Sequence, residues 1–149
     1  MMIATKSKLR ISATLCLAWA VLAAAESPAP GLELTVAGLR NEEGKLSICV
    51  TADRRHFPDC AGDPKAVTRT LSADQHTASF DLPEGVYAVS LIHDENGNGR
   101  LDTMLGIPRE GFAFSRNPAI RLGPPRYDEA RFSVGAGRSS QTLRVRYLL

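Results

Sequence analysis

Residues 86–102 read VYAVSLIHDENGNGRLD and join a strand pattern to a polar loop. Within residues 86–93, apolar side chains occupy both alternating phases: Tyr87, Val89 and Leu91 in one, and Val86, Ala88 and Ile92 in the other. A strand that is apolar on both faces is covered from both sides. The pattern therefore predicts a central strand that delivers the chain directly into the loop beginning at Asp94.

Six further segments alternate apolar and polar residues, which is typical of half-buried strands. They are residues 31–37, 45–51, 66–71, 76–82, 132–134 and 141–148. Between the first two lies a polar turn that ends in Gly44, so we expect these two segments to form a hairpin. With the central strand, the segments predict an all-β fold, an antiparallel β-sandwich of about seven strands like those of immunoglobulin-like domains.

Residues 103–128 are rich in Gly, Pro and Arg and have little periodicity. A stretch of this length is too long for a plain connection in a compact domain. We therefore predict one long structured loop, packed by its own Ile107, Phe112 and Phe114.

The N-terminus has the features of a secretory signal peptide. Lys6, Lys8 and Arg10 precede an apolar run, which ends in small residues at Ala23 and Ala25. The run is shorter than the roughly 20 residues that a membrane-spanning helix needs. We predict a signal peptide at residues 1–25, a leader at 26–30 and a single domain at 31–149, with no transmembrane segment after cleavage.

Export predicts a periplasmic or secreted product. Removal of the signal peptide also changes the net charge and the number of cysteines that remain. Without residues 1–25, fifteen Lys and Arg face sixteen Asp and Glu, a net charge of −1, so we expect no nucleic-acid partner. Cys49 and Cys60 remain as an even pair, which predicts a disulfide in an oxidising compartment. The alternative is a reactive thiol, for which His56 is the only nearby base in sequence.

The polar loop has most of a calcium-binding pattern. Short oxygen-bearing side chains stand at loop positions one, three, five and nine, and Gly99 stands at position six: the four are Asp94, Asn96, Asn98 and Asp102. Alternate side chains of this kind converge on a hard cation, and the backbone carbonyl of Arg100 at position seven can join them. We therefore predict a structural calcium ion that orders the long segment after the loop.

The loop is not an EF-hand, because Leu105 stands where a bidentate Glu is required and no helices flank it. Water or the distant Glu110 would complete the coordination, with a dissociation constant of about 10⁻⁴–10⁻³ M. The alternative is a metal-free hairpin tip, since Asn-Gly pairs favour tight turns without any ion.

His93 continues the inward phase of the central strand, so its ring is expected to anchor the loop by hydrogen bonds. The alternative is a hydrolase that uses His93 and the loop carboxylates.

Arginines recur along the long segment and after it, at positions 100, 109, 116, 121, 126 and 131. They suggest a cationic face for an anionic ligand, with Arg109, Arg116, Arg126 and Tyr127 as candidates. The alternative is the solvated surface of a long loop.

The string HDENGNGRLD-TMLGIPREGFAFS resembles a bacterial exported family catalogued as domain of unknown function 2141. The resemblance extends to GLRNEEGKL, LPEGVYAV and GPPRYDEARFSV, and so covers nearly the whole domain. It implies a small exported β-sandwich and carries no catalytic residue onto this chain. The LPEGVY segment is also similar to transthyretin-like sandwiches.

Together these features favour a non-catalytic, exported binding module whose partner is an unknown envelope component, an anionic one if the arginine face binds it. A hydrolase and a purely structural envelope accessory protein are the two alternatives.

Overall fold

Two β-sheets make up most of the computed structural model, which describes residues 29–149. The smaller sheet has the strand order β10-β1-β4, with β1 at Gly31–Ala37, β4 at Thr77–Asp81 and β10 at Arg138–Arg144. The larger has the order β3-β2-β5-β8, with β2 at Lys45–Thr51, β3 at Val67–Ser72, β5 at Gly85–Asp94 and β8 at Gly111–Phe114. The predicted all-β sandwich class is confirmed.

Three shorter strands and one helical turn complete the described chain. They are β6 at Thr103–Met104, β7 at Ile107–Pro108, α1 at Tyr127–Ala130 and β9 at Phe132–Val134. β6 and β7 form a small separate hairpin, and β9 pairs with the beginning of β5.

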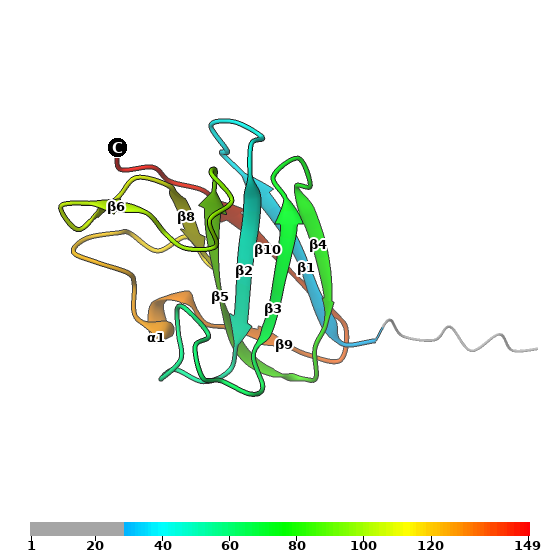
Figure 1. The fold of residues 1–149 in the computed structure, drawn as a ribbon. Coiled ribbons are helices and arrows are strands. Elements are labelled where there is room, and N and C mark those ends of the chain that lie inside the picture. Colours follow the sequence, from blue (N-terminus) through cyan, green and yellow to red (C-terminus); the bar gives the residue numbers. More distant parts are fainter. Residues whose placement is uncertain (1–28) are drawn as a thin grey trace, which may run out of the picture.

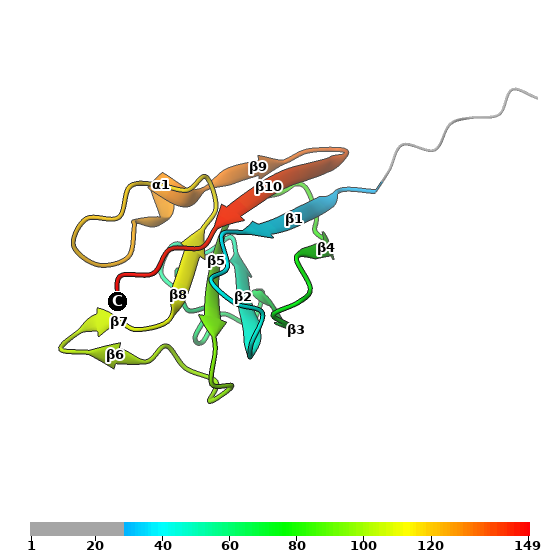
Figure 2. The same ribbon diagram turned by 90° about the horizontal axis from the view of Figure 1, so that it is seen from above.

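The hydrophobic core lies between the two sheets, which face each other in Figures 1 and 2. From the smaller sheet, Leu32, Leu34, Phe80 and Leu143 point into it, and from the larger sheet Leu46, Val50, Val89 and Leu91 do so. These residues occupy alternate strand positions, so the period-two pattern places one complete apolar face of each strand in the core.

Strand β5 is central, as the sequence predicts. It pairs with β2 on Lys45–Thr51 and with β8 through residues 90–93. The second apolar phase of β5 is covered as well, because Ala88 belongs to a smaller cluster with Phe112, Phe114 and Ala130 on the outer face of the sheet.

The predicted hairpin of residues 31–37 and 45–51 is wrong. β1 pairs with β10 and β4, whereas β2 lies in the other sheet, so the turn before Gly44 carries the chain across the sandwich. Each strand buries one apolar face. Two strands with this pattern can be neighbours in one sheet or can face each other from two sheets across the core. The β1–β10 pair is also parallel, so the sandwich is not antiparallel throughout.

The predicted long loop at residues 103–128 is also wrong in part, because it contains β6, β7, β8 and the start of α1. Phe112 and Phe114 are strand residues paired with β5, and Ile120 of the irregular part of the segment packs against the cluster that they form. Strand β8 is buried throughout, so its sequence GFAF lacks the alternation that reveals a half-exposed strand. Ile107 is 43% exposed.

The predicted disulfide between Cys49 and Cys60 is present. Cys49 lies on the outer face of β2, and the bond holds the loop of residues 52–64 against that face.

The predicted signal peptide, residues 1–25, and most of the leader at 26–30 lie outside the described residues, so both stay predictions. Among residues 29–149, no helix has the length and apolar character needed to cross a membrane.

Candidate calcium-binding loop

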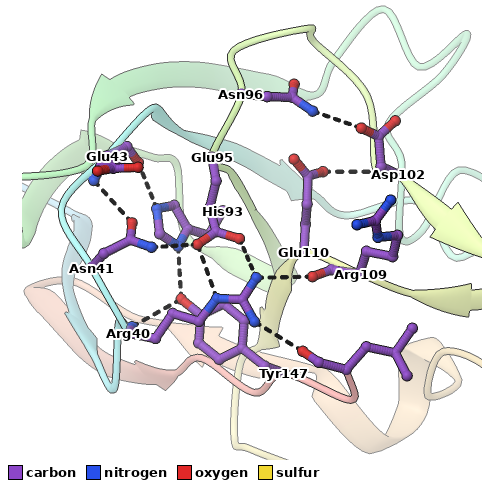
Figure 3. A network of polar contacts seen from close by, with 11 residues as sticks. Arg40, Asn41, Glu43, His93, Glu95, Asn96, Asp102, Arg109, Glu110 and Tyr147 are labelled. Carbon is purple, nitrogen blue, oxygen red and sulfur yellow. Dashed lines mark hydrogen bonds and ion pairs between the residues drawn. The ribbon is translucent and has the colours of Figure 1, made fainter.

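His93 fixes the end of β5 from which the loop leaves the sheet. Its ring is fully buried, with Nδ1 lying 2.7 Å from the hydroxyl of Tyr147 and Nε2 2.7 Å from the carbonyl oxygen of Glu43. A carbonyl can only accept, so Nε2 donates to Glu43, while Nδ1 is paired with the tyrosine hydroxyl. Both ring nitrogens thus have partners, which is what the anchoring interpretation predicts (Figure 3).

The first loop residues are held by an arginine from the other side of the sandwich. Arg40 donates to both carboxylate oxygens of Glu95, at 2.9 and 2.5 Å, and to the carbonyl of Arg109 at 3.1 Å. These bonds, together with one from Asn41, hold the pKa of Glu95 below its ordinary value. The guanidinium also lies 4.4 Å from the ring centre of Tyr147. Arg40 therefore joins the loop to the segment before β8 and to the C-terminal end.

Gly44 allows the preceding turn to lie directly against this part of the loop. Its φ is +72°, and a Cβ atom at this position would overlap the backbone of Asp94 and Glu95. Any other residue would therefore push the turn and the loop apart.

Asp94 bends the loop around its own carboxylate. One of its oxygens accepts the backbone N–H of Asn98 at 3.1 Å, and the other accepts that of Gly99 at 2.7 Å. The side-chain oxygen of Asn96 also accepts the Asn98 N–H, at 3.0 Å. Gly97 and Gly99 both have positive φ, so the turn uses glycine where the backbone requires it.

Asp102 closes the loop from its far end. One of its oxygens accepts the side-chain amides of Asn98 at 2.9 Å and of Asn96 at 2.6 Å, and these bonds lower the pKa of the Asp102 carboxyl. The four predicted side chains, Asp94, Asn96, Asn98 and Asp102, are thus linked in one hydrogen-bonded network. Arg100 donates its backbone N–H to the oxygen of Asn98 and places its guanidinium 3.7 Å from Asp102.

Glu110 adds a third carboxylate to the edge of this network. It is 4% exposed, and its Oε2 accepts the backbone N–H of Asp102 at 3.0 Å. Its Oε1 is buried and has no hydrogen-bond partner within residues 29–149. A buried carboxylate oxygen without a partner is costly unless a cation or water satisfies it.

The donor set suits a hard cation through mixed ligands. Over residues 29–149, no group of three or more His, Cys, Asp and Glu side chains is arranged to hold a metal. A site here therefore needs the amide oxygens of Asn96 and Asn98 beside the carboxylates. The amides now direct their nitrogens toward Asp102, so binding an ion requires both to present oxygen.

The predicted arginine face is not a single cluster. Arg109 precedes β8 and Arg116 follows it, so they lie at opposite ends of that strand. Arg126 lies at the start of α1, where Glu129 accepts its backbone N–H. Tyr127 donates its hydroxyl to the carbonyl of Val86 and packs edge-on against Phe57.

A cleft beside the loop is the main feature that sequence reasoning missed. It encloses about 850 Å³ between the outer face of the larger sheet and two segments, residues 99–108 and 120–124. The only signal in the sequence is the second apolar phase of the central strand, continued by Phe112 and Phe114, and it predicts cover on that face and not a cavity.

The fold and the site define an all-β sandwich domain whose central strand ends in a loop rich in Asp, Asn and Gly. Residues 34–142 match the model of a family described as uncharacterized proteins conserved in bacteria, DUF2141, and the chain belongs to that family. This confirms the family to which the sequence points. Comparison with curated proteins and with solved structures returned no match.

Proposed function

We propose that this protein is a non-catalytic, exported binding module in which the Asp94–Asp102 loop holds a structural calcium ion. One observation carries the proposal: the buried, unpartnered Oε1 of Glu110 lies next to a loop whose Asp and Asn side chains already converge. Calcium prefers six to eight oxygen ligands of this mixed kind and tolerates irregular geometry.

The donors would come from the loop and from Glu110, which immediately precedes β8. Side-chain oxygens of Asp94, Asn96, Asn98 and Asp102, the carbonyl of Arg100 and Oε1 of Glu110 make six. Asp94, Asp102 and Glu110 are not grouped around one point within residues 29–149, so binding would have to draw the Glu110 carboxylate to the ion. A third carboxylate would favour the tighter end of the range of about 10⁻⁴–10⁻³ M for extracellular modules.

The ion would also order the segment that follows the loop. Asp102 immediately precedes β6 and Glu110 immediately precedes β8, so a cation between them closes the base of the β6–β7 hairpin. The backbone bond from Arg109 N–H to the carbonyl of Asp102, 2.9 Å long, closes the same base. Calcium therefore stabilises a hairpin that few other contacts hold to the sandwich.

A hydrolase that uses His93 is not favoured by any specific observation. Both ring nitrogens of His93 are engaged, one by a backbone carbonyl, so neither is free to take a proton from a substrate.

Thermal unfolding with calcium and with chelator tests the proposal. We expect calcium at about 100 times its dissociation constant to add about 2.7 kcal/mol to the free energy of unfolding. The Asp94→Ala and Asp102→Ala variants should lose this gain, and Asp74→Ala, which removes an exposed carboxylate elsewhere, should keep it. Coincident curves in calcium and chelator would overturn the proposal.

A further inference from the structure

The cleft beside the loop has the form of a small-molecule site. Its volume of about 850 Å³ lies within the range of roughly 300–1,000 Å³ found for ligand pockets. The floor is the outer face of β2, β5 and β8. The two segments that rise from this floor, residues 99–108 and 120–124, project from the same side of the molecule in Figures 1 and 2.

The lining of the cleft is mainly apolar. Ile92, Phe112 and Phe114 contribute to the floor, and Leu101, Ile107 and Leu122 to the walls. Among these, Ile107 is 43% exposed and Leu122 is fully exposed. Apolar side chains that gather around a concavity in this way mark a site where a ligand removes them from water.

The charge of the cleft is positive. Arg100 stands on one wall and Arg121 on the other, whereas Asp59 is the only acid among the lining residues. Within residues 29–149, Arg121 forms no ion pair, whereas the guanidinium of Arg100 also lies 3.7 Å from Asp102. An oxygen of Asp59 is engaged by the backbone N–H of Ala61. A guanidinium at the mouth of an apolar cavity is suited to a carboxylate at the end of an apolar chain.

We propose that the cleft binds a free long-chain carboxylate, with its alkyl chain over Phe112 and Phe114 and its carboxylate between Arg100 and Arg121. This inference deepens the proposed function and rests on it in one respect, because the wall at residues 99–108 is the segment that calcium orders. Gly99, Arg100 and Leu101 belong to both the loop and the cleft, so calcium binding shapes the site directly.

Displacement of a fluorescent fatty acid, dansyl-undecanoic acid, by palmitate tests the proposal on the full exported chain. We expect palmitate to displace the probe in calcium, with an affinity at least several-fold weaker in chelator. Hexadecanol, which has the chain without the charge, should compete about tenfold less well, the effect of losing a charge-assisted contact.

Four variants separate the parts of the site. Ser47→Trp places an indole on the floor and should abolish displacement; should it fail to fold, Thr70→Trp on the edge strand fills the same cleft. Arg121→Gln should weaken palmitate about tenfold and leave hexadecanol unchanged. Arg144→Gln, at an exposed arginine outside the cleft, should bind palmitate like the unaltered protein.

The outcomes distinguish this proposal from the calcium proposal. Equal binding in calcium and chelator, still abolished by Ser47→Trp, would support the cleft and overturn its dependence on calcium. A calcium-dependent melt with no palmitate displacement would overturn the cleft alone. If the protein bound anionic phospholipid vesicles and monomeric palmitate did not compete, a free carboxylate would be overturned as the ligand. Full palmitate affinity in both the Ser47→Trp and Arg121→Gln variants would overturn it as well.

Discussion

The carboxylate of Glu110 accepts the backbone N–H of Asp102 through one oxygen, 3.0 Å away, and buries its other oxygen without a partner within residues 29–149. The bond joins the last residue of the Asx-rich loop to the residue that precedes β8, across the β6–β7 hairpin. The bond therefore holds the unpartnered Oε1 of Glu110 where the loop, the hairpin and the larger sheet meet.

Replacing Glu110 by Gln should separate binding from folding. The amide oxygen can still accept the Asp102 N–H, while the buried charge is removed, so the variant should be at least as stable as the unaltered protein in chelator. In calcium it should lose most of the stabilisation, because one of three anionic ligands is gone. Thermal unfolding in both conditions measures this, with Glu84→Gln on an exposed turn as the control. A large loss of stability in chelator would show that Glu110 is only a structural acceptor.

The Cys49–Cys60 disulfide should contribute strongly to stability. It joins residues that are 11 apart in sequence, and closing a loop of this size stabilises by about 3 kcal/mol on the chain-entropy model. Urea unfolding of the oxidised protein and of the Cys49→Ala, Cys60→Ala double variant should differ by about this amount. Equal stabilities would show that the loop of residues 52–64 is held by packing alone.

Tyr147→Phe should destabilise the anchor of the loop. It removes the hydroxyl that bonds Nδ1 of His93 and accepts the backbone N–H of Arg40, and the buried ring nitrogen is left unsatisfied. We expect a loss of about 1–3 kcal/mol in the free energy of unfolding. Tyr87→Phe is the matched control, because its hydroxyl makes one exposed bond to the carbonyl of Pro83. A loss no larger than that of the control would contradict the anchoring role.

Stability should fall in acid through carboxylates that are bonded in the folded state. The pKa of Glu95 lies below its ordinary value of 4.5, chiefly because of Arg40. The ionised Glu95 carboxylate therefore contributes its full stabilisation above its ordinary pKa. This contribution is lost as the pH falls through the lower pKa of the folded state. Urea unfolding between about pH 6 and pH 3 should show a shallower loss for Glu95→Gln than for the unaltered protein, with Glu84→Gln as the control. Identical slopes in all three proteins would contradict the assignment.

The sequence allowed prediction of the strands that bury one apolar face and of the central strand that buries both. Leu32 and Leu34 alternate with polar residues because the outer side of β1 is partly exposed, whereas both sides of β5 are covered and its apolar residues do not alternate. Pairing was harder to predict. Nothing in the alternation of residues 31–37 distinguishes a neighbour in the same sheet from a partner across the core, so the expected hairpin failed.

Strand β8 was missed for a related reason. Its four residues, GFAF, are buried throughout and are flanked by Glu110 and Ser115, so they show neither alternation nor the length of an ordinary central strand. The loop residues from Asp94 to Asp102 were predictable, since their spacing lies within one short segment. Glu110 could be named only as a distant ligand, because its approach depends on the β6–β7 hairpin, and the cleft depends on how two irregular segments stand off the sheet.

A calcium titration followed by the backbone amide signals of the folded protein tests the central claim most directly. The account predicts that the signals of Asn98, Gly99 and Asp102 shift and saturate at about 10⁻⁴–10⁻³ M calcium, together with those of the β6–β7 hairpin, while the signals of β4 stay in place. Amide signals of residues 94–110 that do not move at about ten times that concentration would contradict it.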